Sequence, residues 1–304
     1  MNAIRYLERS EIDISRWDRC IDTAANGRIY GYSSYLDLMS TAWSALVVGD
    51  YLAVVPLPYR SRYGIHYLYP PAFTGPLAIY GVPPQGLSAA EILAGIPEKF
   101  RLWDMNIDLK AGSVPWPHTI RKNHVLPLAV GYDAIRKRYR ATVRNTLNRR
   151  RNEPGVIRSG IPIGEVVDAA AAAGVMGDTT MHDRERLRSL YAMLSAQDMA
   201  WTTGLFDISG KLIAAALFFR SHQRIYYMAA WSGEAGRVAG GSVALIDHTI
   251  RAFAGQDMVL DFEGSDIPGI AFFFEGFGAD IEEYLFIRKN GLPWWCRWMK
   301  GKIS

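Results

Sequence analysis

Hydrophobic and polar residues alternate along two long stretches of the chain in the manner of β-hairpins. From Ser44, the stretch SALVVGDYLAVVPLPYRSRYGIHYLYPP reads as three strands, the first two joined at Gly49 and Asp50. From Thr202, TTGLFDISGKLIAAALFFRSHQRIYYMAAWSG repeats this succession of strands and polar turns. Period-2 alternation bounded by turn residues is typical of strands. The chain is therefore expected to contain two three-stranded antiparallel meanders.

Similar segments surround each meander. A helical pattern precedes each meander, and a helix-sized segment and then a further apolar run follow it. In the first half these three features are residues 33–40, 88–96 and 101–109, in that order. In the second half they are residues 183–199, 242–254 and 258–262. An internal duplication is the simplest explanation. We expect an α+β fold of mixed α/β character, in which each domain is a mixed, mostly antiparallel sheet flanked by helices. The boundary is placed near Gly131, giving domains of residues 1–130 and 131–304.

A strongly basic segment joins the two halves. Residues 131–151, GYDAIRKRYRATVRNTLNRRR, carry eight bases and one acid, a charge of +7, so the net charge of +4 leaves −3 for the remainder. A helix is expected over residues 133–152, stopped by Pro154 and Gly155. A solvated helix face is one interpretation, and binding of tRNA phosphates or of an acidic acceptor is the other. The stretch AAAAAGVMG from Ala169 is expected to form a loose connector.

Composition narrows the class of protein. Hydrophobic residues make up 49% and charged residues 21% of the 304 residues, as in a folded soluble protein. The first residues lack the pattern of a signal peptide, and no run of about 18 uncharged apolar residues occurs, so we expect a cytoplasmic protein without a transmembrane segment. Cys20 and Cys296 have no metal-ligand spacing and the six histidines form no ligand pair, so no metal is expected.

The stretch GEAGRVAGGSVALIDHTIRAF has the composition of a phosphate-binding loop. It places a short loop containing Arg237, Ala239, Gly240, Gly241 and Ser242 directly before a helix. Amide groups at the start of a helix lack partners within the helix and, together with its dipole, favour an anion. A plain turn followed by an N-cap is the alternative interpretation.

The pattern Arg237-x-x-Gly240-x-Ser242 resembles the Q/R-x-x-G-x-G/A pyrophosphate loop of the GNAT acyltransferases, with Ser242 where Gly or Ala is usual. The resemblance implies that this loop holds the diphosphate of coenzyme A. It also implies that the strand of residues 224–231 splays from that of residues 258–262. Pantetheine then pairs with the free strand edge, where Ala229 and Ala230 are small enough to admit it.

The whole chain is similar to the tandem fold of the Fem-type (FemAB-like) peptidyltransferases and their acyltransferase relatives. The features that carry this resemblance are the duplicated halves, the basic linking segment, Gly276-Phe277-Gly278 and a strand at residues 284–288. Fem-type enzymes commonly have Phe-Lys before the Gly-Phe-Gly element, whereas this chain has Phe273-Phe274, which argues against a tRNA-dependent reaction. In the first half, the corresponding stretch after Gly81 contains two prolines, which lack amide donors. One active site, in the second half, is therefore expected.

Two carboxylates follow the apolar run near the end of the second half, in VLDFEGSD. On a strand Asp261 and Glu263 share a face, so they are candidates to hold an ammonium group and to accept its proton. The alternative is that they are solvated residues at a strand end. Tyr284 is a candidate proton donor to a leaving thiolate, and a main-chain amide near Ala230 is a candidate oxyanion donor.

The leading hypothesis is an acyltransferase that moves an acyl group from acyl-CoA, such as acetyl-CoA, to the amine of a small molecule or peptide. One alternative is an aminoacyl-tRNA-dependent peptidyltransferase that acts on a cell-wall precursor. The other is a non-catalytic protein that binds RNA or another anionic polymer through residues 131–151.

Overall fold

The structure is a computed structural model that describes residues 4–151, 155–264 and 267–292. The chain folds into two compact units, unit 1 of residues 1–121 and 283–304, and unit 2 of residues 122–282. This division differs from the expected one at residues 130 and 131, because most of the last described strand, from residue 283 onward, is assigned to unit 1. Strand β13 (Asp280–Asn290) pairs through Leu285 to Asn290 with β6 (Phe100–Ile107). Sequence order alone does not reveal such a pairing.

Unit 1 is built on one mixed sheet. The pairings are antiparallel from β1 to β4, parallel between β4 and β6, and antiparallel between β6 and β13. The other strands are β1 (Ile4–Glu8), β2 (Ala42–Val48), β3 (Ala53–Arg62), β4 (Ile65–Leu68) and the short β5 (Tyr80–Gly81), which pairs with β3. The helices are α1 (Ile14–Thr23), α2 (Ser33–Met39) and α3 (Ala89–Ala94), with 3-10 turns at Arg9–Glu11 and Ile29–Gly31.

Unit 2 repeats the same succession of pairings. It runs antiparallel from β8 through β9 and β10 to β11, parallel from β11 to β12, and antiparallel from β12 to β7. The strands are β8 (Val156–Ser159), β9 (Ala200–Phe206), β10 (Leu212–Ser221), β11 (Arg224–Ser232), β12 (Val259–Asp261) and β7 (His118–Pro127). The fold class and both expected meanders are confirmed. In each unit, the last strand of this succession comes from the other half of the chain.

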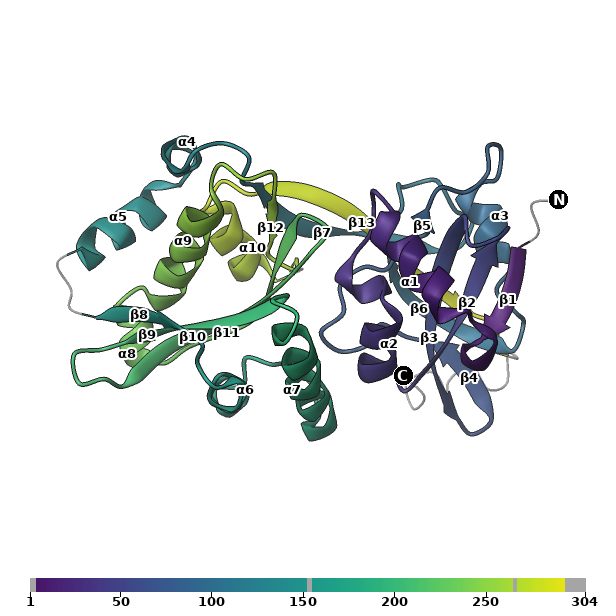
Figure 1. Cartoon of the computed structure of the whole chain (residues 1–304), viewed down its shortest axis with the longest axis horizontal. Coiled ribbons are helices and arrows are strands. Elements are labelled where there is room, and N and C mark those ends of the chain that lie inside the picture. Colours follow the sequence, from purple (N-terminus) through teal and green to yellow (C-terminus); the bar gives the residue numbers. More distant parts are fainter. Residues whose placement is uncertain (1–3, 152–154, 265–266, 293–304) are drawn as a thin grey trace. The chain divides into compact units, whose positions relative to one another are not determined.

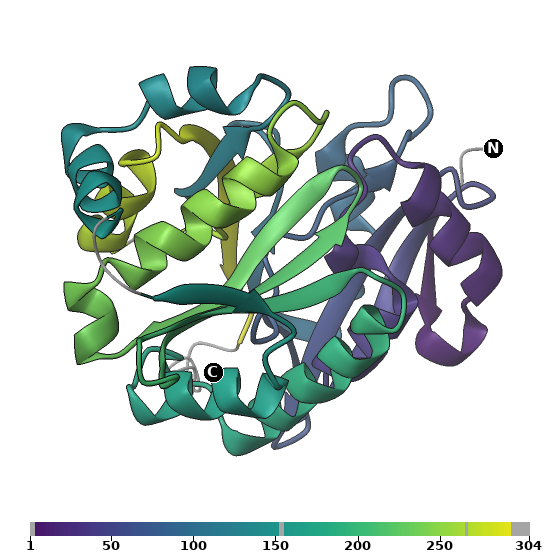
Figure 2. The ribbon, with the colours of Figure 1, turned by 60° about the vertical axis from the view of Figure 1, so that its left-hand side comes forward.

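Helices cover both faces of the sheet in unit 2. Figure 2 shows α9 crossing the strands on one face, and Figure 1 places α6 and α7 on the other face. Leu245, Ile246 and Ile250 of α9 are buried in the main core against the strands, whereas Val166 of α6 packs against Ala215 on the opposite face. The helices of unit 2 are α4 (Tyr132–Lys137), α5 (Ala141–Arg150), α6 (Ile163–Ala172), α7 (Met181–Ser195), α8 (Glu234–Val238), α9 (Gly241–Phe253) and α10 (Pro268–Glu275). In the described part of the chain, no helix is long and apolar enough to cross a membrane.

The expected single helix over residues 133–152 is wrong, because the described part of this segment forms two helices, α4 and α5. Tyr139 lies between them, is 1% exposed and donates a hydrogen bond from its hydroxyl to Asp247 Oδ1 at 3.0 Å. The next residue, Arg140, donates its amide to the Gly276 carbonyl. Burying Tyr139 turns the chain at a point where the charge pattern showed only a continuous basic run.

The expected loose connector after Ala169 is also wrong in its first part. Residues 169–172 are the last turn of α6, as the high helix propensity of alanine favours. Gly174, with φ of 68°, follows the end of the helix.

Candidate functional site

The expected phosphate-binding residues lie at the junction of α8 and α9. Arg237 is on α8, not in the expected loop; its side chain is exposed, and Nη1 donates to the Ser232 carbonyl at 3.1 Å. Ala239 follows α8, and Gly240, with φ of 66° and ψ of 35°, is the N-cap of α9. The helix begins at Gly241, so the amides of its first turn, which includes Ser242, have no acceptor within the helix. These amides and Arg237 are the groups of the junction that the sequence predicted to contact an anion.

The glycines of this junction make close contacts with protein atoms. A Cβ atom on Gly240 would lie 2.3 Å from Thr146 Cγ2 of α5, and one on Gly241 would lie 2.5 Å from Ala214 Cβ of β10. Both glycines are therefore required by packing, and Gly240 also by its left-handed backbone.

Part of the basic segment is engaged in holding this junction. Arg149 Nη2 donates to the Val238 carbonyl at 2.9 Å, and Arg150 Nη1 lies 3.5 Å from the Ala239 carbonyl. These carbonyls are at the C-terminal end of α8, where positive charge is favourable. The segment is thus not a uniformly solvated helix face.

Strand β11 separates from β12 after a short paired stretch. Only Arg224, Ile225 and Tyr226 pair with β12. A bulge at Met228 follows, because Ala229 opposes Leu217 whereas Tyr227 opposes Phe218. Ala229, Ala230 and the rest of β11 are only half-buried. In the described part of unit 2, this half of β11 therefore has a strand neighbour only on its β10 side.

Tyr227 links this strand to the start of α9. Burial raises the pKa of the Tyr227 phenol, and a hydrogen bond with the Ser242 side chain opposes that rise. The Tyr227 ring contacts Phe262 and Phe274, and the rings of Phe262 and Phe274 stack with centroids 4.7 Å apart. Phe274, which stands where Fem-type enzymes commonly have lysine, is thus a buried core residue, 5% exposed.

Asp261 is the centre of a buried polar cluster. Its Oδ2 accepts from Arg224 Nη1 at 2.5 Å, while its Oδ1 accepts from Asn123 Nδ2 at 2.9 Å and from the Glu263 amide at 2.8 Å. Burial lowers the pKa of the Arg224 guanidinium, but the carboxylates of Asp261 and Glu282 outweigh this and raise the pKa above its ordinary value. Asp261 is 4% exposed, and its carboxylate already accepts hydrogen bonds from three donors. This leaves little room for a role as a free base.

Glu263 does not share a strand face with Asp261. Strand β12 ends at Asp261, and Glu263 has φ of 62°, in the left-handed region that non-glycine residues rarely adopt. The expected alternation fails because the strand is shorter than the apolar run suggested. Tyr284, the third candidate catalytic residue, is a half-buried residue of β13 in unit 1, whereas the two acids belong to unit 2.

One histidine of unit 2 was missed as a candidate. His124 of β7 is 1% exposed, and neither ring nitrogen has a hydrogen-bond partner among the described residues. Its Nε2 lies 3.9 Å from Glu275 Oε1, and its ring contacts Phe274. Burial lowers the pKa of His124, while Glu275 opposes that shift. No signal in the sequence marks this histidine, because its neighbours come from distant segments. Among the described residues, no group of three or more His, Cys, Asp or Glu residues is arranged to hold a metal ion.

Comparisons with known proteins identify the fold. Neither the protein-family models nor the curated proteins include a match to this chain. Among solved structures, FemX has a TM-score of 0.66 at 11% identity, covering 93% of this chain and 97% of that one. A tandem GNAT protein from the clavulanic acid biosynthesis pathway has a TM-score of 0.53 at 11% identity, covering 96% and 99%. L-PGS from Bacillus licheniformis has a TM-score of 0.56 at 12% identity, covering 91% and 92%. Together with the repeated sheet, these similarities show that the chain has a tandem GNAT-like fold.

Proposed function

We propose that the protein is an acyltransferase that moves an acyl group from acyl-CoA, such as acetyl-CoA, to the amine of a small molecule or peptide. The observation that carries this proposal is the edge of β11 at Ala229 and Ala230, which has no strand neighbour among the described residues and lies beside the start of α9. The amides of pantetheine can pair with the main chain of that edge at Ala229 and Ala230, as an added strand does. The diphosphate then lies at the first turn of α9, where the amides, the helix dipole and Arg237 favour an anion.

The proposed chemistry is direct transfer. The ammonium group of the acceptor first gives a proton to a base, and the neutral amine then attacks the thioester carbonyl. The tetrahedral intermediate collapses with release of the thiolate, which takes up the second proton from the amine nitrogen. A main-chain amide near Ala230 donates to the developing oxyanion. We assign the base to Glu263, because the Asp261 carboxylate is committed to Arg224 and Asn123. Tyr284 has no step in this scheme.

Calorimetric titration of the whole chain with acetyl-CoA tests the donor site. Arg237→Glu places a carboxylate beside the proposed diphosphate, so binding is expected to be lost in this variant. Lys211→Glu makes the same change of charge at an exposed residue of the β9–β10 turn and is expected to bind as the wild type does. Absence of binding by the wild type would remove coenzyme A from the proposal. Equal binding by the wild type and Arg237→Glu would show that the donor binds elsewhere than at the start of α9.

A second candidate function is aminoacyl transfer from charged tRNA, with a cell-wall precursor as the acceptor. The fold similarity to FemX and the basic segment of residues 131–151 favour it. The burial of Phe274 against Phe262, at a position where Fem-type enzymes commonly have lysine, argues against it. Transfer from aminoacyl-tRNA without turnover of acetyl-CoA would select this candidate.

A further inference from the structure

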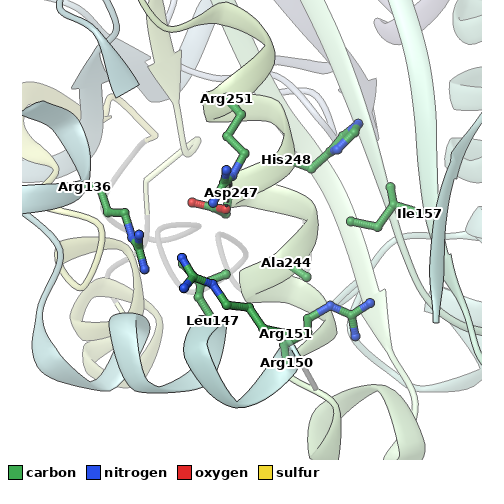
Figure 3. Close-up of a pocket in the computed structure, with 9 residues that line it drawn as sticks. All are labelled: Arg136, Leu147, Arg150, Arg151, Ile157, Ala244, Asp247, His248 and Arg251. Carbon is green, nitrogen blue, oxygen red and sulfur yellow. Dashed lines mark hydrogen bonds and ion pairs between the residues drawn. The ribbon is translucent and has the colours of Figure 1, made fainter. Parts of the chain in front are cut away.

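A basic pocket of about 200 Å³ lies in unit 2 between α4, α5, α9 and the start of β8. Figure 3 shows the side chains that line it. On α9 they come from Ala244 and later residues, beyond the helix start that is the proposed donor site. The lining residues are Arg136, Leu147, Arg150, Arg151, Ile157, Ala244, Asp247, His248 and Arg251.

The charge of this pocket is strongly positive. Four arginines line it against a single acid, Asp247, which leaves a charge of +3 with His248 counted as neutral. Asp247 is 4% exposed and accepts hydrogen bonds from Tyr132 at 2.8 Å, from Tyr139 at 3.0 Å and from Arg251 Nε at 2.8 Å. With three donors around it, Asp247 holds the wall of the pocket in place.

The two tyrosines stay protonated and keep donating to Asp247. Burial and the Asp247 carboxylate raise the pKa of Tyr132 to about 12. The same two causes raise the pKa of Tyr139 further. The Asp247 charge is therefore shared among fixed donors over the whole physiological pH range.

Two of the arginines are held so that part of each guanidinium remains available. Arg251 is fixed through Nε to Asp247, and its guanidinium carbon lies 4.1 Å from the centroid of the Tyr132 ring. Arg136 donates from Nη2 to Asn148 Oδ1 at 3.0 Å. A guanidinium has five donors in a rigid fork, so one anchored nitrogen leaves others to bind an oxyanion.

We propose that this pocket binds the phosphate group of a phosphate ester. Arginine forks match the several oxygens of a phosphate, and the negative charge of the phosphate offsets the mutual repulsion of the four arginines. The pocket is smaller than the roughly 300–1,000 Å³ of sites that enclose a whole drug-sized ligand, so it takes the phosphate end of a larger molecule. Two sources share this chemistry: a small nucleotide and the backbone of an RNA. The inference goes beyond the proposed function, because it holds for either donor.

Calorimetric titrations of the whole chain with adenosine 3′,5′-bisphosphate and with tRNA test this inference. Arg151→Glu places a carboxylate in the pocket lining and is expected to weaken binding about tenfold or more, since a hydrogen bond to a charged group contributes about 1.5–3 kcal/mol. Lys137→Glu is the matched control, because it makes the same change of charge beside Arg136 but outside the lining. This control is expected to change affinity less than twofold at about 150 mM salt, where charges beyond about 8 Å are screened.

The outcomes separate the two sources. Binding of the bisphosphate that Arg151→Glu weakens assigns the pocket to a nucleotide. Binding of tRNA but not of the bisphosphate assigns the pocket to an RNA backbone. In that case the logarithm of the binding constant is expected to fall linearly with the logarithm of the salt concentration. The proposal is overturned if neither ligand binds, or if Arg151→Glu and Lys137→Glu weaken binding equally. It is also overturned if Arg237→Glu abolishes bisphosphate binding while Arg151→Glu leaves it intact, because the phosphate then lies at the start of α9.

Discussion

Arg224 and Asp261 form a buried ion pair in unit 2, with Nη1 and Oδ2 2.5 Å apart and side chains 9% and 5% exposed. Two further groups complete the cluster: Glu282, which accepts from Arg224 at 3.1 Å, and Asn123, which donates to Asp261. The pair joins the first residue of β11 to the last residue of β12. It therefore holds these parallel strands together at the end where they pair, next to the point where they separate.

Arg224→Met is expected to lower the free energy of unfolding by about 3–5 kcal/mol, because it leaves the Asp261 carboxylate buried without its cation. Urea denaturation measures this loss. Arg9→Met is the control, since it breaks an ion pair of 2.7 Å with Asp37 whose side chains are 37% and 42% exposed. That variant is expected to lose at most about 1 kcal/mol. Equal losses in the two variants would show that Arg224 contributes no more than a surface ion pair does.

Gly241→Ala is expected to destabilise the protein by about 1–3 kcal/mol, the usual cost of overpacking. Its new Cβ would lie 2.5 Å from Ala214 Cβ, which would force α9 away from β10. Gly164→Ala is the matched control in the first turn of α6, where the nearest atom lies 3.8 Å from the new Cβ. That change is expected to stabilise the protein by about 0.5–1 kcal/mol. Thermal unfolding of both variants tests the pair, and a stabilised Gly241→Ala would contradict the packing argument.

The local elements of this fold could be predicted from the sequence because neighbouring residues encode them. Ser88 shows this: it begins the expected helix-sized segment of residues 88–96, and it forms a capping box with Glu91 at the start of α3. The two meanders and the helix after the α8–α9 junction are further cases. Such features depend on turns, caps and periodicity within a few residues, which a single sequence displays.

The features that escaped prediction depend on residues far apart in the chain. The Asp261 carboxylate is bonded to residues 37 and 138 positions away, so its burial was not visible in the stretch around it. Tyr139 interrupts the basic segment because Asp247, 108 positions later, accepts its hydroxyl. The arginine pocket likewise combines residues of α4, α5 and α9. Tertiary contacts, not local propensity, decide these parts of the site.

His124 is expected to make the stability of the protein depend on pH. Its pKa is lower in the folded state than the ordinary value of about 6.5, because burial outweighs the opposing effect of Glu275. Above pH 6.5, His124 is neutral in both the folded and the unfolded chain, and the stability that depends on its neutral form is fully present. As the pH falls below this value the unfolded chain takes up the proton first, and the contribution is lost down to the folded-state pKa.

The variant His124→Phe is expected to lose this part of the pH dependence in urea denaturation between pH 7.5 and 5. At pH 7.5 it is expected to be at least as stable as the wild type, because it removes two buried nitrogens that have no hydrogen-bond partner among the described residues and keeps a ring beside Phe274. His182→Gln, at an exposed histidine of α7, is the control and is expected to behave as the wild type does. An unchanged pH dependence in His124→Phe would show that other groups cause it.

Glu263→Gly is expected to raise stability and lower activity together. The left-handed backbone of Glu263, with φ of 62°, costs about 1–2 kcal/mol for a residue with a Cβ, and glycine relieves that cost. If Glu263 accepts the proton of the amine, removing its carboxylate lowers acyl transfer from acetyl-CoA by about 100-fold or more. Glu263→Gln is the matched variant, because it keeps the backbone cost and loses only the charge, so it is expected to lose activity without gaining stability. Urea denaturation and a thiol-release assay measure the two properties. A Glu263→Gly protein with wild-type turnover would exclude Glu263 as the base, and the strained backbone would then require another explanation.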